Sequence, residues 1–155
     1  MGASRFRYAL EPIALQRRWT LDDLQRELGE RNTALARERA ARDAVLAQVA
    51  GAGEEWKALG AGGQIVTVGR FALIARYLAE RRAQAEQMAL AIAALQDARD
   101  ELVGRLVAAR RALDAVEEHR EQMRKEFIKA RLSGEFKVAD DQWSVLRARE
   151  QGHGN

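Results

Sequence analysis

Residues 71–130 read FALIARYLAERRAQAEQMALAIAALQDARDELVGRLVAARRALDAVEEHREQMRKEFIKA, and apolar side chains recur in this stretch at alternating steps of three and four. Fifteen of the eighteen positions in this frame are apolar, the exceptions being Arg81, Arg99 and Arg120. Such spacing lines one face of a helix, whereas a strand requires a period of two. The stretch predicts a second helix over about 70–132, with a seam roughly 90 Å long at 1.5 Å per residue.

A similar frame precedes this stretch, from Leu10 to Leu59, and eleven of its fifteen positions are apolar. Pro12 is tolerated only near a helix start, so we expect the first helix over about 11–59. Six of the twelve glycines lie in residues 51–69. Because each Gly costs a helix about 1 kcal/mol relative to Ala, they predict a Gly-rich connector over about 60–69. Residues 64–68 form a β-branched patch that we expect to be briefly extended.

Two long seams and one short connector predict an all-α fold, a long two-helix antiparallel coiled-coil hairpin forming a single domain over residues 1–155. Ser133 and Gly134 predict the end of the second helix, followed by a C-terminal segment, 133–155, that forms a short helical extension. If the turn centres near residue 64, residue n lies opposite residue 128 − n. Arg31 would then face Asp97 and Arg42 would face Glu86, unless these long side chains simply reach solvent.

The composition indicates long helices rather than a compact globule. Charged residues make up 32% of the chain, nine residues are aromatic and Cys is absent. A lack of Cys removes disulfides and thiolate chemistry and fits a reducing compartment. The longest apolar run, residues 88–95, is far shorter than the roughly 20 residues that span a bilayer, and residues 1–10 show no signal-peptide pattern. We expect a cytoplasmic protein without membrane insertion.

Positive charge is concentrated in two segments of the sequence. Residues 1–18 and residues 119–137 each carry a net charge of +3, whereas the rest of the chain carries −3. These charges are modest and acids are interleaved with them, which disfavours a nucleic-acid stripe even though Phe6, Tyr8 and Trp19 could stack on bases. A protein partner is the favoured reading, and a basic nucleic-acid-binding coiled coil is the weaker alternative.

The chain has no motif that would support catalysis. Gly60-Ala61-Gly62-Gly63 lacks the Lys-Ser/Thr of a phosphate-binding loop and reads as a helix-breaking turn. His119 is surrounded by acidic residues but has no set of metal ligands beside it, so a solvated helix surface is favoured. The acid pairs Glu54-Glu55 and Glu117-Glu118 have no concave site to tune them. We therefore expect no enzyme activity, metal, cofactor or small-molecule substrate.

The three tryptophans are unusual in a hairpin with so little depth. Trp56 lies on the first seam, where packing is favoured. Trp19 and Trp143 lie off the seams, and each is either a local packing contact or an anchor for a partner.

The N-terminal sequence resembles the opening of the FliJ family of flagellar export proteins and of their YscO-type injectisome relatives. The residues that carry the resemblance are Arg5-Phe-Arg-Tyr8, Leu10, Ile13 and Arg17, followed by the heptad helix. Near the other end, Asp140-Asp141 and Trp143 stand where relatives often have an acid pair followed by an aromatic residue.

The resemblance implies a small non-catalytic stalk of the type III secretion export apparatus, peripheral to the inner membrane. In that family the hairpin end with both termini enters the pore of a hexameric ATPase ring, the opposite part reaches toward the export gate, and members escort export chaperones. The basic residues expected to bind the ring are Arg5, Arg7, Arg17, Arg18, Arg120, Arg124, Lys125 and Lys129.

For the export gate, the resemblance implies exposed residues early in the second helix. Tyr77 and Arg81 are the candidates here. Phe71, Ile74 and Leu78 also match the helical spacing, but they belong to the seam and are interpreted as core. The alternative to the stalk is a homo-oligomeric coiled-coil scaffold or chaperone-like clamp.

Overall fold

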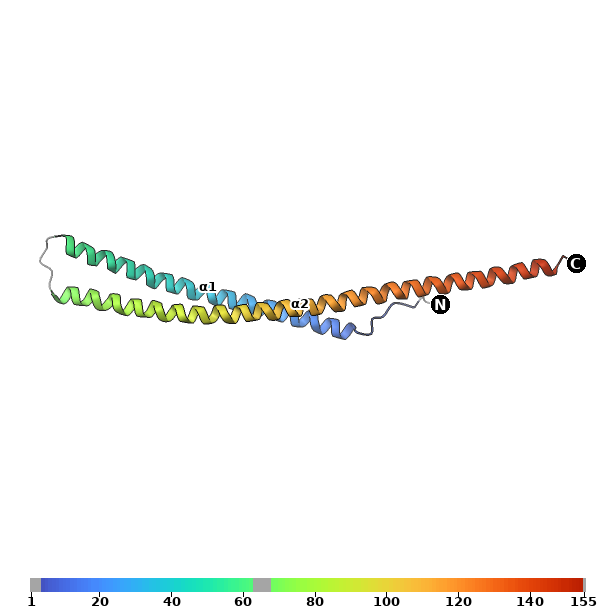
Figure 1. Ribbon diagram of the computed structural model, residues 1–155, viewed down its shortest axis with the longest axis horizontal. Helices are drawn as coiled ribbons and strands as arrows, with labels where there is room; N and C mark the ends of the chain where they lie inside the picture. The colour runs from blue at the N-terminus through green and yellow to red at the C-terminus, as the bar shows by residue number, and fades with distance from the viewer. Residues whose placement is uncertain (1–3, 63–67, 155) are drawn as a thin grey trace. The chain divides into compact units, whose positions relative to one another are not determined.

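The computed structural model describes residues 4–62 and 68–154, and in these ranges the regular elements are two helices. The first, α1, spans Glu11–Ala61 and the second, α2, spans Val68–Gly152. The chain divides into two compact units: unit 1 contains Met1–Leu21 and Ala108–Asn155, and unit 2 contains Asp22–Val107. Within each unit the two helices run in opposite directions (Figure 1), which confirms the all-α helical hairpin.

The start of α1 agrees with the position of the single proline. The carbonyl of Leu10 accepts hydrogen bonds from the amides of Ile13 and Ala14, both at 3.0 Å. Pro12 therefore occupies the first turn, where its missing amide hydrogen has no intrahelical partner to lose. Glu11 places a negative charge in the same turn, which the helix dipole favours.

The end of α1 lies within two residues of the expected position. The helix continues through Gly60 to Ala61, and Gly62 follows it as a bend. Half of the expected connector, residues 63–67, lies outside the described residues, and so do residues 64–67 of the expected extended patch. Its last residue, Val68, is not extended but is the first residue of α2.

The expected break at Ser133 and Gly134 does not occur, because α2 continues without interruption to Gly152. A Cβ added at Gly134 would meet no atom within 4 Å, so the glycine occupies an ordinary helical position. Arg131 and Glu135 form an ion pair across it at 3.5 Å. One glycine costs about 1 kcal/mol, which neighbouring helix formers outweigh. The expected short separate extension is therefore the last part of α2.

The buried side chains follow the two predicted seams. Leu35 and Leu102 are each 2% exposed and Ile92 is 3% exposed, all three in unit 2. Eleven of the twelve buried hydrophobic residues are seam positions, and Tyr8 is the exception. Each unit thus has a narrow core along the line where the helices meet. The eleven are Ala14, Leu21, Leu24, Leu35, Val45, Leu78, Ala85, Ile92, Leu102, Leu113 and Val116.

Two charged seam residues of α1 form ion pairs along their own helix rather than across the hairpin. Arg31 lies 3.3 Å from Glu27, and Arg42 lies 3.0 Å from Asp43. Within the described residues no ion pair joins Arg31 to Asp97 or Arg42 to Glu86, which favours the alternative in which these side chains reach solvent. A two-helix seam is open to water on both edges, so a long arginine can reach solvent and a nearby carboxylate without crossing it.

The expected register agrees with the observed contacts. The rule 128 − n places residue 72 opposite Trp56, and the rings of Trp56 and Phe71 pack edge to face at 4.9 Å in unit 2. This contact supports the packing role of Trp56, which remains 37% exposed. In unit 1 the rule places residue 111 opposite Arg17, whose side chain bonds to the carbonyl of Ala112.

Candidate interaction surfaces

Tyr8 attaches the segment before α1 to α2 within unit 1. Its ring is 9% exposed and belongs to a small core with Ala14 and Val116. Its hydroxyl shares a hydrogen bond with Nδ1 of His119 at 2.5 Å and donates a longer one to the carbonyl of Val116 at 3.5 Å. His119 is exposed, as expected, but its ring also packs on Tyr8 at 5.5 Å.

Phe6 makes a second contact of the same kind. Its ring lies 5.6 Å from that of Phe127, and Phe6 and Met123 pack against the Tyr8 core. The aromatic residues of the N-terminal motif are therefore used inside unit 1. Because Phe6 and Tyr8 are packed on α2, neither is presented as a free stacking platform for a nucleic-acid base.

Three of the eight basic residues assigned to the ATPase ring form contacts between α1 and α2 within unit 1. Arg17 donates a hydrogen bond to the carbonyl of Ala112 at 2.6 Å. Arg120 lies 3.1 Å from Oε2 of Glu11, an ion pair without hydrogen-bond geometry. Arg18 bridges two acids, with 3.9 Å to Glu11 and 3.5 Å to Glu117. These residues join the two helices, so only part of their charge is available to a partner.

Arg124 has an ion pair on its own helix, with Nη2 at 2.9 Å from Glu121. The hydrogen bond from Arg124 holds the pKa of the Glu121 carboxyl below its usual range, and the same bond raises the pKa of Arg124. Both side chains are solvent-exposed, so this pair contributes little to stability.

The other four basic residues assigned to the ring are exposed and have no ion pair within the described part of the chain. They are Arg5, Arg7, Lys125 and Lys129. We name these four residues the basic surface. It contains four of the eight residues expected from the sequence, because Arg17, Arg18 and Arg120 contact the other helix and Arg124 pairs with an acid of its own helix.

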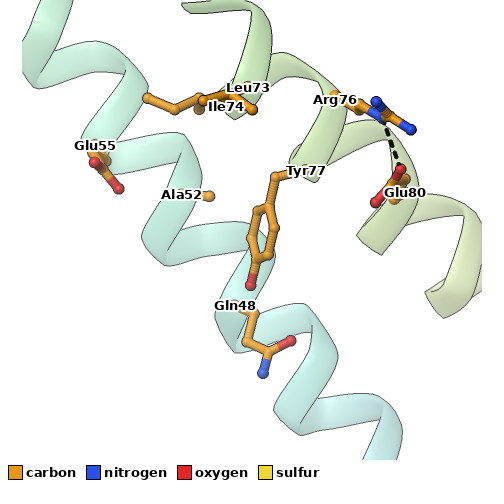
Figure 2. A pocket seen from close by; sticks show the side chains of 8 residues that line it. All are labelled: Gln48, Ala52, Glu55, Leu73, Ile74, Arg76, Tyr77 and Glu80. Atoms are coloured by element: carbon orange, nitrogen blue, oxygen red, sulfur yellow. Dashed lines mark hydrogen bonds and ion pairs between the residues drawn. The ribbon is translucent and has the colours of Figure 1, made fainter. Parts of the chain in front are cut away.

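A groove of about 710 Å³ lies between α1 and α2 in unit 2 and contains one of the two expected gate residues. Figure 2 shows the Tyr77 side chain extending from α2 toward α1, with its hydroxyl end beside Gln48. On the rim, Arg76 and Glu80 form an ion pair at 3.1 Å. The lining residues are Gln48, Ala52, Glu55, Leu73, Ile74, Arg76, Tyr77 and Glu80.

Arg81, the other expected gate residue, lies against Tyr77. Its guanidinium carbon is 5.2 Å from the centre of the Tyr77 ring, a cation–π distance, and its Nη1 donates to Gln84 at 2.8 Å. The two side chains predicted from the sequence are thus brought together, and Arg81 holds the ring on one side. Arg81 itself does not line the groove.

The seam residues near the groove have the expected roles in part. Phe71 packs on Trp56 and Leu78 is buried, which supports reading both as core. Ile74 is half-buried and lines the groove. Sequence reasoning missed Leu73, which is 70% exposed at the groove. Leu73 could have been identified from the sequence, because it is a large apolar residue that does not belong to the seam.

Trp19 and Trp143 are both strongly exposed, at 61% and 63%. Such exposure favours an anchor for a partner over a local packing contact, since neither indole is covered.

The described residues hold no group of three or more His, Cys, Asp or Glu side chains placed to bind a metal ion. Among the described helices, none has an apolar stretch long enough to cross a membrane.

The fold and these surfaces define a helical-hairpin protein with one candidate protein-binding surface in each unit. Comparison of the chain with protein-family models, with curated proteins and with solved structures gives no match. The relation to FliJ-like proteins therefore rests on the sequence motif alone.

Proposed function

We propose that the chain is a non-catalytic stalk protein of a type III secretion export apparatus. In this proposal unit 1 binds the hexameric export ATPase and the groove of unit 2 binds the export gate protein. The chain acts at the cytoplasmic side of the inner membrane and also escorts export chaperones, as the resemblance of its N-terminal sequence to the FliJ family implies.

The observation that carries the proposal is the packing of the N-terminal motif on α2. Phe6 and Tyr8 are fixed by ring contacts, whereas Arg5 and Arg7, which alternate with them in the sequence, remain exposed. In the motif that carries the resemblance, the aromatic side chains thus pack on α2 and the arginine side chains face solvent. An exposed row of positive side chains on a fixed backbone suits an acidic protein surface, because complementary charge speeds association and orients the partner.

The groove supports the second half of the proposal. Leu73 and Tyr77 offer apolar surface, while Glu55, Arg76 and Glu80 surround it with charge. An apolar centre with a polar rim is the usual composition of a protein-binding patch. Tyr77 is well suited as an anchor, since it combines a large ring with a hydroxyl group.

The test is the hydrolysis rate of a hexameric export ATPase from the same cell, measured with and without this chain. The wild-type chain is expected to hydrolyse no ATP itself and to raise turnover or hexamer formation. Reversal of Arg5, Arg7 and Lys125 to Glu should abolish that stimulation, since charge reversal across a complementary interface costs several kcal/mol.

The matched control is reversal of Arg37, Arg82 and Arg105 to Glu. These three arginines are also exposed and have no ion pair within the described residues, so the net charge changes equally. Circular dichroism should show unchanged helicity in both variants, because exposed charge changes alter stability by about 0.5 kcal/mol or less each. Equal stimulation by both variants, or none by the wild type at stoichiometric excess, would refute ATPase binding through the basic surface.

A further inference from the structure

The last part of α2 carries an apolar stripe that no other segment of the described chain covers. Phe136 is 72% exposed and Trp143 is 63% exposed. Successive steps of three and four residues place the members on one face of the helix. We name them the C-terminal stripe: Ile128, Leu132, Phe136, Ala139, Trp143 and Leu146.

One half of the stripe is hollowed. A depression of about 500 Å³ has apolar walls from Ile128, Leu132 and Phe136, and Lys125 and Lys129 stand at its edge. The other half presents the large indole of Trp143. The stripe therefore has a hollow near one end and a projecting ring near the other.

We propose that the C-terminal stripe binds the same stripe of a second copy of this chain in an antiparallel pair. If Ile128 lies opposite Trp143 of the second copy, Leu132 lies opposite Ala139 of that copy. Phe136 then lies beside Phe136 of the second copy. The indole then enters the hollow of the other chain, and the two-fold axis repeats the contact. This inference goes beyond the proposed function and does not depend on it.

The charges beside the stripe favour the antiparallel direction. Lys129 and Asp140 lie on the same edge of the stripe, eleven residues apart. In an antiparallel pair equal edges face each other, so Lys129 meets Asp140 of the second copy, and the contact occurs twice. On the other edge of the stripe, Glu135 lies near Glu135 of the second copy. Arg131, which forms an ion pair with Glu135 at 3.5 Å, compensates the negative charge of each carboxylate.

A parallel pair is disfavoured by the same residues. In parallel coiled coils, flanking positions five residues apart face each other across the seam. Glu135 would then face Asp140 of the second copy on both sides, which sets like charges against each other.

The contact is small enough to be reversible. A fully buried aromatic side chain contributes about 150–250 Å², and this pair contains two phenylalanines and two tryptophans that are only partly covered. The total area is on the order of 1,000 Å², at the low end of specific interfaces. We therefore expect monomers at low concentration and dimers at a concentration on the order of 100 µM.

Disulfide trapping tests the direction of the pair, because the 155-residue sequence contains no Cys. Glu135→Cys should give a covalent dimer on mild oxidation, since position 135 lies beside its own copy and outside the apolar stripe. Gln142→Cys is the matched exposed control on the same edge. In the antiparallel pair, position 142 lies about 20 Å from position 142 of the second copy, so this variant should crosslink at least tenfold more slowly.

Charge reversal tests the register by sedimentation equilibrium. Lys129→Glu and Asp140→Lys should each weaken dimerisation about tenfold, and the double variant should restore it, because both intermolecular pairs are re-formed with opposite polarity. Phe136→Ser should remove the dimer while circular dichroism shows unchanged helicity. Equal crosslinking at positions 135 and 142, a double variant that is not restored, or a monomer at all concentrations would overturn the proposal. The last result would assign the stripe to a different protein.

Discussion

The hydroxyl oxygen of Tyr8 lies 2.5 Å from Nδ1 of His119, although 111 residues separate them in sequence. Tyr8 precedes α1 and His119 lies on α2, so this one contact joins the non-helical start of the chain to the second helix. The contribution of this contact to the free energy of unfolding can be measured, because the hydroxyl group and the ring of Tyr8 can be removed separately.

Tyr8→Phe should lower the free energy of unfolding by about 1 kcal/mol, the usual net contribution of one hydrogen bond. Tyr8→Ala should lower it by about 3 kcal/mol, because a buried ring is also lost. Urea titration followed by circular dichroism measures both. Tyr77→Phe is the control, since that ring is 37% exposed and the change should stay below about 0.5 kcal/mol. Equal effects at the two tyrosines would contradict the role of Tyr8.

Glu11→Gln should destabilise the hairpin by less than about 1 kcal/mol, since the carboxylate is about half exposed and water screens its ion pairs with Arg18 and Arg120. The difference should shrink in 1 M NaCl, where the Debye length is about 3 Å. Thermal unfolding at low and high salt measures it. Glu80→Gln removes one pair within α2 and should have a smaller effect. If the loss of stability in Glu11→Gln were the same at low and high salt, Glu11 would act through its position in the first turn of α1 and not through the ion pairs.

Gly134→Ala should stabilise the C-terminal part of α2 by about 0.5–1 kcal/mol, because alanine is the better helix former and the added methyl meets no atom within 4 Å. Amide hydrogen exchange at residues 130–140 should slow about two- to fivefold. Gly29→Ala, at another open helical position, is the control for the method. Faster exchange in Gly134→Ala would mean that the helix ends at this glycine.

Leu73→Ser and Tyr77→Ala should each weaken binding of the export gate protein about tenfold or more, because both remove apolar contact area from the groove of unit 2. Leu90→Ser is the matched control, since Leu90 is 67% exposed and does not line the groove. Isothermal titration with the cytoplasmic part of the gate protein measures the three affinities. If Leu90→Ser weakens binding as much as Leu73→Ser, the groove is not the contact.

The heptad pattern predicted most of the fold because burial in a two-helix hairpin depends almost entirely on periodicity. It located both helices, the register near 128 − n and eleven of the twelve buried hydrophobic residues. It could not locate Tyr8, which is buried without being part of a helix. The helix end expected at Ser133 and Gly134 was wrong, because a glycine is compatible both with a turn and with an ordinary helical position, and the sequence alone does not distinguish them.

The candidate sites were predictable to a smaller extent. Tyr77 and Arg81 were chosen from the sequence and do lie together. The pairing of Arg17, Arg18 and Arg120 within unit 1 was not predictable, because it depends on the side chains that face them from the other helix. Charge counts along a sequence do not show which arginines are already neutralised.

The narrow core has a consequence for how this sequence can change over time. Twelve hydrophobic residues in the described part of the chain are buried, so substitutions at most other positions meet water on at least one side. Exposed substitutions typically alter stability by about 0.5 kcal/mol or less. Selection for folding therefore acts on a sparse set of positions, and surfaces on the rest of the helices can acquire or lose binding partners with little risk to the hairpin.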